Sequence, residues 1–404
     1  MRQITYNWML ASDTRRLMNV FEGAGAEIRF VGGCVRDSLL GREVSDIDIA
    51  TDALPDRIVK ILWDAGIKSV PTGIEHGTVT AIVEGRAFEI TTYRRDIKND
   101  GRHAVVEFGT DWREDAERRD FTINAMSITP DGNLHDLFDG EGDLAAGRVR
   151  FVGDAQRRVR EDILRILRWF RFHAHYGKPA PDADALGACR GFAFRISDLS
   201  GERIRHELLR LLAADNPMPS IELMVETDVI DAVLGRGRQT ERLAGLCAIE
   251  RETNTPIDPL LRLAALIGSS GMVAPLTERL RLSNVEQQRL FAALATEPPL
   301  GLDTPEAHRA RIFYRLGSRI AEDRILLAWA ANPTSMAWGE WLEALRSFDI
   351  PAFPLSGRDV MAEGVAAGPA VGEVLRQIED WWIAGGFSPD RAQCLVHLKD
   401  ILGT

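Results

Sequence analysis

The chain has 404 residues, of which 45% are hydrophobic and 27% are charged, and its formal net charge at pH 7 is −11. This length and composition predict a folded protein of two to four domains, each able to bury its own core. The acidic balance argues against a protein that binds nucleic acid by bulk attraction, and the lack of an 18-residue apolar stretch or a secretory signal predicts a cytoplasmic protein without membrane spans.

The first third of the chain combines short buried strands with short helices. Glu84-Gly85-Arg86 separates two segments in which β-branched residues alternate, so residues 77–94 predict a β-hairpin. The other expected elements are a strand at residues 27–31, a helix at 35–40, a strand at 46–50 and a helix from about 55 to 65. Together they predict a mixed α and β domain.

After residue 150 the sequence changes to helical periodicity. One continuous helix is expected over residues 157–177, with an apolar stripe formed by Ile163, Leu167, Phe170 and Ala174. Further amphipathic helices are expected over residues 201–296, with proline-rich and glycine-rich connectors at 297–306 and 348–357. The predicted fold class is α+β, with an N-terminal mixed β-sheet domain followed by helical domains.

Two carboxylates lie two positions apart on the predicted strand at residues 46–50. Alternate side chains of a strand share a face, so Asp46 and Asp48 should point the same way. Two such charges about 4 Å apart repel by about 4 kcal/mol at an effective dielectric of 20, which predicts a cation between them. Oxygen ligands favour Mg²⁺, and Glu89 would add a third carboxylate if its strand lies beside the first. Taken alone, such a pair is more often two solvated loop acids.

Gly32 and Gly33 stand directly after a predicted strand and before a predicted helix. Small residues at such a junction let backbone N–H groups approach an anion closely. Arg36, one helical turn further on, could supply a guanidinium fork to the same phosphate. The alternative is a tight turn in which Arg36 pairs with Asp37. Glycines, arginine and paired acids together favour a nucleoside triphosphate with its metal ion.

The predicted helix at residues 157–177 carries six arginines between Arg157 and Arg171, a positive strip suited to a triphosphate or an RNA backbone. Asp162, Arg165 and Trp169 are spaced by three and four residues, which places them on one face, away from the apolar stripe. The alternative for this series is a surface helix held by its own salt bridges.

Six stretches follow one another within residues 28–210: GGCVRDSLLG, SDIDIAT, FEITTYR, RRDFTINAM, DLFDGEGDLAAGRVRFVG and EDILRILRWFRF. In this order they resemble the successive motifs of the class II tRNA nucleotidyltransferases, the CCA-adding enzymes, which share their head domain with bacterial poly(A) polymerases. The resemblance implies a nucleotidyltransferase head at residues 1–150, a helical neck with a base-template helix at 151–215, a helical body at 216–340 and a tRNA-binding tail at 341–404.

The resemblance implies a reaction in which the 3′-hydroxyl of tRNA attacks the α-phosphate of CTP or ATP and pyrophosphate leaves. Asp46 and Asp48 would hold two Mg²⁺ ions, one lowering the pKa of the attacking hydroxyl and one neutralising the triphosphate. Glu89 matches the third carboxylate of the family. Gly32, Gly33 and Arg36 would contact the triphosphate.

The remaining roles follow from the same resemblance. Arg119 would contact the nucleotide and Asp120 would help to recognise the ribose hydroxyl, the alternative for Asp120 being a helix cap or a salt bridge. Cytosine and adenine both present an amino donor beside a ring-nitrogen acceptor, so the carboxylate of Asp162 and the guanidinium of Arg165 would select C and A together. Such a paired contact contributes about 1 to 3 kcal/mol of discrimination. The family also places Arg168 and Arg171 near the bound nucleotide.

The implied partners are tRNA, CTP and ATP, and no stable protein partner is implied. The long polar segment at residues 94–120 is expected to be a mobile loop, and its length favours addition of the full CCA over CC alone. A poly(A) polymerase with the same head domain is the nearest alternative function. A catalytically silent RNA-binding protein is the alternative from another class.

Overall fold

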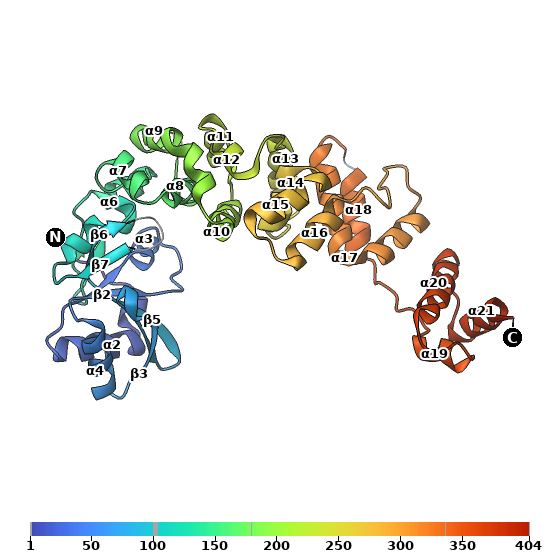
Figure 1. Cartoon of the computed structure of the whole chain (residues 1–404), viewed down its shortest axis with the longest axis horizontal. Helices are drawn as coiled ribbons and strands as arrows, with labels where there is room; N and C mark the ends of the chain where they lie inside the picture. The colour runs from blue at the N-terminus through green and yellow to red at the C-terminus, as the bar shows by residue number, and fades with distance from the viewer. Residues whose placement is uncertain (1, 100–103, 179, 336, 404) are drawn as a thin grey trace. The chain divides into compact units, whose positions relative to one another are not determined.

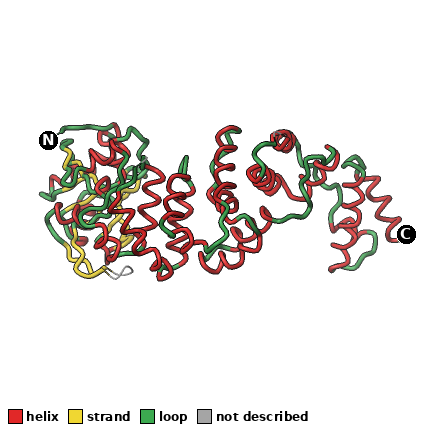
Figure 2. Tube along the Cα trace, turned by 90° about the horizontal axis from the view of Figure 1, so that it is seen from above, coloured by secondary structure: helices red, strands yellow, loops and turns green. Residues whose placement is uncertain are grey.

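The computed structural model describes residues 2–99, 104–178, 180–335 and 337–403 (Figure 1). The chain divides into two compact units, residues 1–236 and residues 237–404. All strands of the described residues belong to the first unit, and the second is built from helices (Figure 2). The predicted α+β class is confirmed. The finer division at residues 150, 215 and 340 stays a prediction.

A seven-stranded sheet forms the centre of the first unit. Its strands are β1 (Ile28–Val31), β2 (Asp48–Thr51), β3 (Lys68–Gly73), β4 (Thr78–Val83), β5 (Arg86–Thr92), β8 (Ser127–Ile128) and β9 (Leu134–His135). They are ordered β3-β4-β5-β2-β1-β8-β9. The β2–β5 pair is parallel and the other neighbours are antiparallel, so the sheet is mixed, as predicted.

The predicted hairpin is formed by β4 and β5. Along β4, buried residues alternate with half-buried ones, the pattern of a strand with one face in the core. Its turn residues Glu84 and Gly85 have φ values of 51° and 86°. Two central residues with positive φ are the requirement of the tight hairpin turn that matches strand twist. The hairpin matters for function because it places β5 beside β2.

The helices of the first unit cover and extend this sheet. They are α1 (Asn7–Leu10), α2 (Ser12–Gly23), α3 (Gly33–Leu39), α4 (Pro55–Asp64), η1 (Ile74–His76), α5 (Trp112–Glu117), η2 (Thr122–Asn124), α6 (Gly140–Ala146), α7 (Ala155–Glu161), α8 (Leu164–Tyr176), α9 (Ala183–Phe192), η3 (Ala193–Asp198), α10 (Gly201–Leu212), α11 (Met218–Glu226) and α12 (Val229–Leu234). The expected helix at 35–40 thus begins at Gly33, and the one expected at 55–65 is α4.

The segment expected as a mobile loop contains regular structure. Residues Arg94–Asn99 and Ala104–Phe108 pair as the antiparallel strands β6 and β7 of a separate two-stranded sheet. The apolar, β-branched and aromatic residues of AVVEF were the signal for a strand that the prediction of a polar loop overlooked. Residues 100–103, between the two strands, lie outside the described residues.

The single helix predicted over residues 157–177 is wrong. The chain breaks between α7 and α8, where Asp162 has extended dihedral angles of φ −151° and ψ 112°. Asp162 is the C-terminal cap residue of α7, and its Oδ1 atom accepts a hydrogen bond from Leu164 N, the first residue of α8. Trp169 is also not on the exposed face expected for it, because it is fully buried and its Nε1 donates to Val149 O.

The second unit is helical throughout its described residues. Its helices are α13 (Thr240–Glu252), α14 (Pro259–Ile267), η4 (Ser270–Met272), α15 (Val273–Leu280), α16 (Asn284–Leu294), α17 (Glu306–Ala331), α18 (Ala337–Arg346), α19 (Gly357–Ala362), α20 (Pro369–Ala384) and α21 (Arg391–Leu402). Arg262 on α14 is 1% exposed and pairs with Glu250 on α13 at 2.6 Å. Val360, Ile378, Trp382 and Leu398 join the last three helices in a common core.

Across the described residues, no single helix has both the length and the apolar content to cross a membrane. Only α14 together with Ser270–Leu280 meets that test, as a pair bent by 105°.

Candidate active site

A cavity of about 850 Å³ in the first unit gathers the motifs found in the sequence. Among the described residues, nine arginines and six acidic residues line it, so the wall is locally positive in an acidic chain. The predicted site residues in its lining are Gly32, Gly33, Arg36, Asp46, Asp48, Arg119, Asp120, Asp162, Arg165, Arg168 and Arg171. Glu89 is the predicted site residue that does not line it.

The two acids of the D-x-D motif both face this cavity, but they do not share a strand as expected. β2 begins at Asp48, and Asp46 lies in the preceding loop. The reason lies in the neighbouring strand: Phe30 of β1 pairs with Ile49, and β1 ends one residue later, at Val31. Beyond that point the chain before Asp48 loses its partner on β1. The carboxylates are brought together by this loop rather than by strand alternation.

Asp48 is a partly buried carboxylate with two acids and two arginines nearby. Burial raises the pKa of Asp48, the carboxylates of Glu89 and Asp46 raise it further, and Arg119 and Arg36 oppose the increase. Glu89 stands opposite Asp48 in the parallel β2–β5 pair, as anticipated, and is exposed. In the part of the chain that the structure describes, neither Asp46 nor Asp48 forms an ion pair.

This donor set fits a cation that arrives with its substrate. The described residues contain no group of three or more His, Cys, Asp or Glu side chains arranged to hold a metal by themselves. Mg²⁺, however, commonly uses one or two carboxylates and takes its other ligands from water and substrate phosphates. Asp46 and Asp48 meet that requirement, because both are hard oxygen donors that line the cavity and lie near enough to interact electrostatically.

Gly32 makes room for this arrangement. Its φ of 71° lies in the left-handed region, and a Cβ there would sit 3.2 Å from Arg119 Nη1 and 3.5 Å from Asp48 Oδ2. A side chain would therefore press against the Arg119 guanidinium, and it would strain the backbone at this positive φ. Gly32 therefore suits this turn both by its backbone conformation and by the close cavity groups.

Arg36 lines the cavity and also forms the ion pair that was its alternative reading. Its Nε and Nη2 atoms donate to the carboxylate of Asp37, and Nη1 donates to Asn124 Oδ1 at 2.7 Å. Its guanidinium lies 4.3 Å from the ring centroid of Tyr176. With these partners Arg36 is held rigidly at the cavity wall.

Arg118 and Arg119 are held by a residue that the sequence reading did not single out. Asp115, only 3% exposed, accepts hydrogen bonds from Arg118 through Oδ1 and from Arg119 through Oδ2. Burial by itself would raise the pKa of Asp115, but the two guanidinium groups outweigh it and lower the pKa. The signal was the helical spacing of three and four residues from Asp115 to the two arginines.

Asp120 forms the salt bridge that was its alternative reading. Its Oδ2 accepts from Arg168 Nε at 2.8 Å, and its Oδ1 accepts from Asn124 Nδ2 and from Phe121 N. Burial alone would raise the pKa of Asp120, but Arg168 and these hydrogen bonds lower it to about 2. Arg168 and these hydrogen bonds therefore stabilise the ionised form of Asp120 in the cavity wall.

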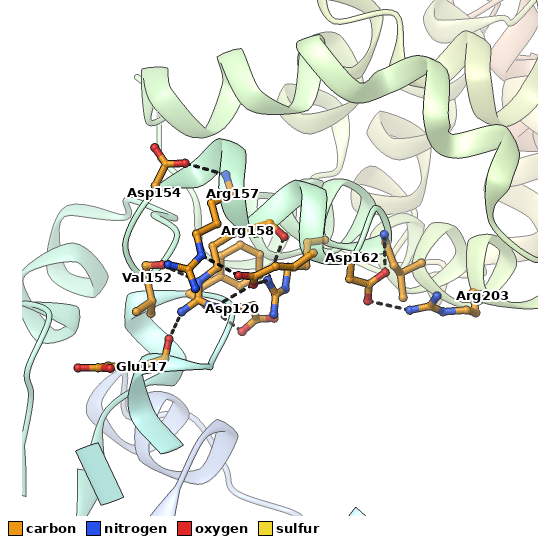
Figure 3. Close-up of polar contacts among 12 residues, drawn as sticks. Glu117, Asp120, Val152, Asp154, Arg157, Arg158, Asp162 and Arg203 are labelled. Carbon is orange, nitrogen blue, oxygen red and sulfur yellow. Dashed lines mark hydrogen bonds and ion pairs between the residues drawn. The ribbon is translucent and has the colours of Figure 1, made fainter. Parts of the chain in front are cut away.

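The proposed base-reading residues meet at the break between α7 and α8. Asp162 Oδ2 accepts a hydrogen bond from Arg203 Nη2 at 2.8 Å (Figure 3). Arg165, 7% exposed, uses Nη1 to donate to Glu161 Oε2 at 2.6 Å and to Arg158 O. Arg158 in turn donates to Val152 O and to Glu117 O, which ties α7 to the sheet domain (Figure 3).

α10 supplies cavity residues that the sequence reading missed. Arg203 and Arg210 line the cavity, and Glu207 between them accepts from Arg171 Nε at 2.5 Å. Arg171 itself is 8% exposed. The signal was again helical: these three side chains are spaced by four and three residues in GERIRHELLRLL, on a helix whose apolar residues face the core.

Known proteins resemble this chain over nearly its whole length. The family described as Poly A polymerase head domain matches residues 28–150, and that described as probable RNA and SrmB- binding site of polymerase A matches residues 181–236. The mitochondrial CCA tRNA nucleotidyltransferase 1 of Danio rerio is 35% identical over 95% of this chain and 89% of its own length. The CCA-adding enzyme of Limosilactobacillus fermentum is 31% identical over 96% of each chain. The chain belongs to the CCA-adding tRNA nucleotidyltransferases.

Solved structures of CCA-adding enzymes agree with this assignment. The Bacillus stearothermophilus CCA-adding enzyme in complex with CTP has a TM-score of 0.80 and 29% identity, covering 96% of this chain and 97% of its own. The Thermotoga maritima CCA-adding enzyme complexed with tRNA, 21% identical with a TM-score of 0.68, shares the fold. Because CCA-adding relatives include mitochondrial proteins, the cytoplasmic location stays a prediction.

Proposed function

We propose that this chain adds CCA to the 3′ end of tRNA from CTP and ATP, releasing pyrophosphate at each step. The observation that carries the proposal is the single cavity in which the paired acids Asp46 and Asp48 and the base-reading pair Asp162 and Arg165 all lie. A nucleotidyl transfer needs the first pair, and a selection of C and A without an RNA template needs the second.

Asp46 and Asp48 would hold Mg²⁺ against the triphosphate. When bound, Mg²⁺ lowers the pKa of the attacking hydroxyl and neutralises charge on the triphosphate and leaving group. The carboxylates orient that charge on one wall of the cavity, and Glu89 on the adjacent strand strengthens the local negative potential. The arginines Arg119, Arg168 and Arg171 face the same space and suit the remaining phosphate charge.

Base selection would come from groups that remain available at the break before α8. Arg165 spends Nη1 on Glu161 and Arg158, which leaves Nε and Nη2 to donate to the ring nitrogen of C or A. Each oxygen of Asp162 can accept a second hydrogen bond, from the exocyclic amino group. Uracil and guanine present a carbonyl and an N–H instead and are rejected. Asp120, ionised above pH 2, would accept from the ribose hydroxyl.

Primer extension separates this function from the alternative that the head-domain match keeps open, a poly(A) polymerase. Purified protein is incubated with tRNA ending before CCA and with CTP alone, ATP alone or both. The proposal expects two C additions with CTP alone and one further A when ATP is present, followed by arrest. Extended A tails from ATP alone would support the polymerase. Unchanged activity in Asp46→Ala and Asp48→Ala would refute both catalytic readings and leave an RNA-binding role.

A further inference from the structure

Both oxygens of the Asp162 carboxylate are fixed by donors from two different helices. Oδ1 accepts from Leu164 N, the first residue of α8, at 3.0 Å. Oδ2 accepts from Arg203 Nη2 on α10 at 2.8 Å, across 41 residues of sequence. Figure 3 shows Arg203 reaching Asp162 from the side of the neighbouring helix. Both oxygens of the carboxylate are therefore held, although Asp162 lies at the break between α7 and α8 and outside both helices.

The two helices that provide these donors are packed as one body. α8 and α10 lie against each other, and a second, buried ion pair between Arg171 and Glu207 joins them one turn further along α10. Arg203 is thus carried by the α8–α10 pair, which also holds the cavity residue Arg171. The side chain of Arg203 is 30% exposed and lines the cavity, close enough to the nucleotide site to influence it.

We propose that Arg203 is a specificity-determining positioning residue, which orients Asp162 for selection of C and A against U and G. This inference rests on the proposed function and deepens it. A carboxylate turns freely about its terminal bond, because that torsion has broad minima. With Leu164 N as its only donor, Asp162 would rotate about Oδ1, and Oδ2 would leave the position from which it accepts the amino group of the base.

By orienting the Asp162 carboxylate, Arg203 affects the choice between bases more than the affinity for nucleoside triphosphates in general. If Asp162 Oδ2 is misplaced, it no longer distinguishes the amino group of cytosine from the carbonyl of uracil. The preference for CTP over UTP then falls. A direct bond from Arg203 to the triphosphate would behave differently, because every nucleotide carries the same phosphates. Its loss would weaken CTP, ATP, UTP and GTP equally and leave their ratios unchanged. The ratio of CTP to UTP therefore separates the two roles.

The test measures equilibrium binding of CTP and UTP, and kcat/KM for both on the same tRNA, in the full-length wild type and in Arg203→Gln. Because the tRNA is common to both reactions, any change in its binding cancels in the ratio. We expect the CTP-to-UTP preference to fall about tenfold in Arg203→Gln. Arg203→Lys, which restores a cationic donor without the planar fork, should recover part of that preference.

Glu207→Gln is the matched control, since it disturbs the other ion pair between the same two helices. It should change CTP and UTP binding by the same factor and keep their ratio within about twofold. Thermal unfolding of each variant checks that it is folded. If the wild type prefers CTP and Arg203→Gln keeps that preference, the inference is overturned and the proposed function stands. A wild type that binds CTP and UTP equally overturns the proposed function and the inference with it.

Discussion

The two ends of the cavity treat negative charge in opposite ways. At the D-x-D end, Asp48 sits beside Glu89 and Asp46, and its pKa is raised first by burial and then by these carboxylates. At the helical end, acids meet arginines: Asp120 pairs with Arg168, Asp162 with Arg203, Glu161 with Arg165 and Glu207 with Arg171. At the D-x-D end, Asp46 and Asp48 form no ion pair within the described residues, although Arg119 and Arg36 lie near enough to oppose the rise in pKa, and we call this the uncompensated end. At the helical end each of these acids is paired with an arginine, and we call it the compensated end.

Removing charge at the uncompensated end should have the largest effect. Asp48→Asn is expected to lower kcat of nucleotide addition by at least about 10³-fold, because an amide loses the charge that holds the divalent cation. Single-turnover primer extension at saturating Mg²⁺ measures it. Asp64→Asn is the matched control, since Asp64 is an exposed helix acid paired with Lys60 and absent from the cavity lining. Equal activity in the two variants would contradict the role of Asp48.

A change at the compensated end should alter selectivity before rate. Asp162→Asn places an amide donor where the carboxylate accepts, and this favours the carbonyls of U and G. The preference for CTP over UTP should fall by the equivalent of about 1 to 3 kcal/mol, measured as the ratio of kcat/KM values. Asp198→Asn, an exposed acid on η3, should keep the preference of the wild type. If Asp162→Asn changes only the common rate, the two ends do not differ as argued.

Asp115 holds Arg118 and Arg119, which line the cavity, but it does not line the cavity itself. Asp115→Asn keeps the shape of the side chain but weakens both guanidinium bonds. KM should rise about tenfold for CTP and ATP alike, because one misplaced cation affects every triphosphate. The CTP-to-UTP ratio should stay unchanged. A selective loss of one nucleotide would show that Asp115 belongs functionally to the base-reading end.

The pKa of Asp120 is lowered and that of Asp48 is raised, so the two carboxylates should affect the stability of the folded protein in opposite directions. These are the smallest effects expected. The pKa of Asp120 is lowered from 3.8 to about 2, so its contribution to stability is full above the ordinary value and disappears as pH falls toward 2. The pKa of Asp48 is raised, so its ionisation in the folded state is unfavourable and costs stability as pH rises through that pKa.

Thermal unfolding without divalent ions, measured as a function of pH, reads out both signs. At pH 7 Asp120→Asn should lower Tm by on the order of 5 °C, whereas Asp48→Asn should raise it by on the order of 2 °C. Both differences from the wild type should shrink on acidification. Shifts of the same sign at pH 7 would show that the contrast between the two ends is not electrostatic.

Most of the sheet domain was predictable, because its signals are local. Alternation along β4 and β5 and the Glu84-Gly85 turn indicated the hairpin, and the glycines before α3 indicated the turn into that helix. The residue types at the cavity were also predictable from the motifs. What failed were details that depend on neighbours: Asp46 outside the strand, Trp169 in the core and the break at Asp162.

The sequence by itself determined where strands, turns and most helices form, since these depend on residues two to four positions apart. The sequence also determined that acids, arginines and glycines suited to binding a triphosphate occur in successive motifs of the first unit. Only the tertiary structure decided which of them pair. Asp162 meets Arg203 across 41 residues and Asp120 meets Arg168 across 48. Such partners are chosen by helix packing, and a buried charge must take the opposite charge that packing places beside it.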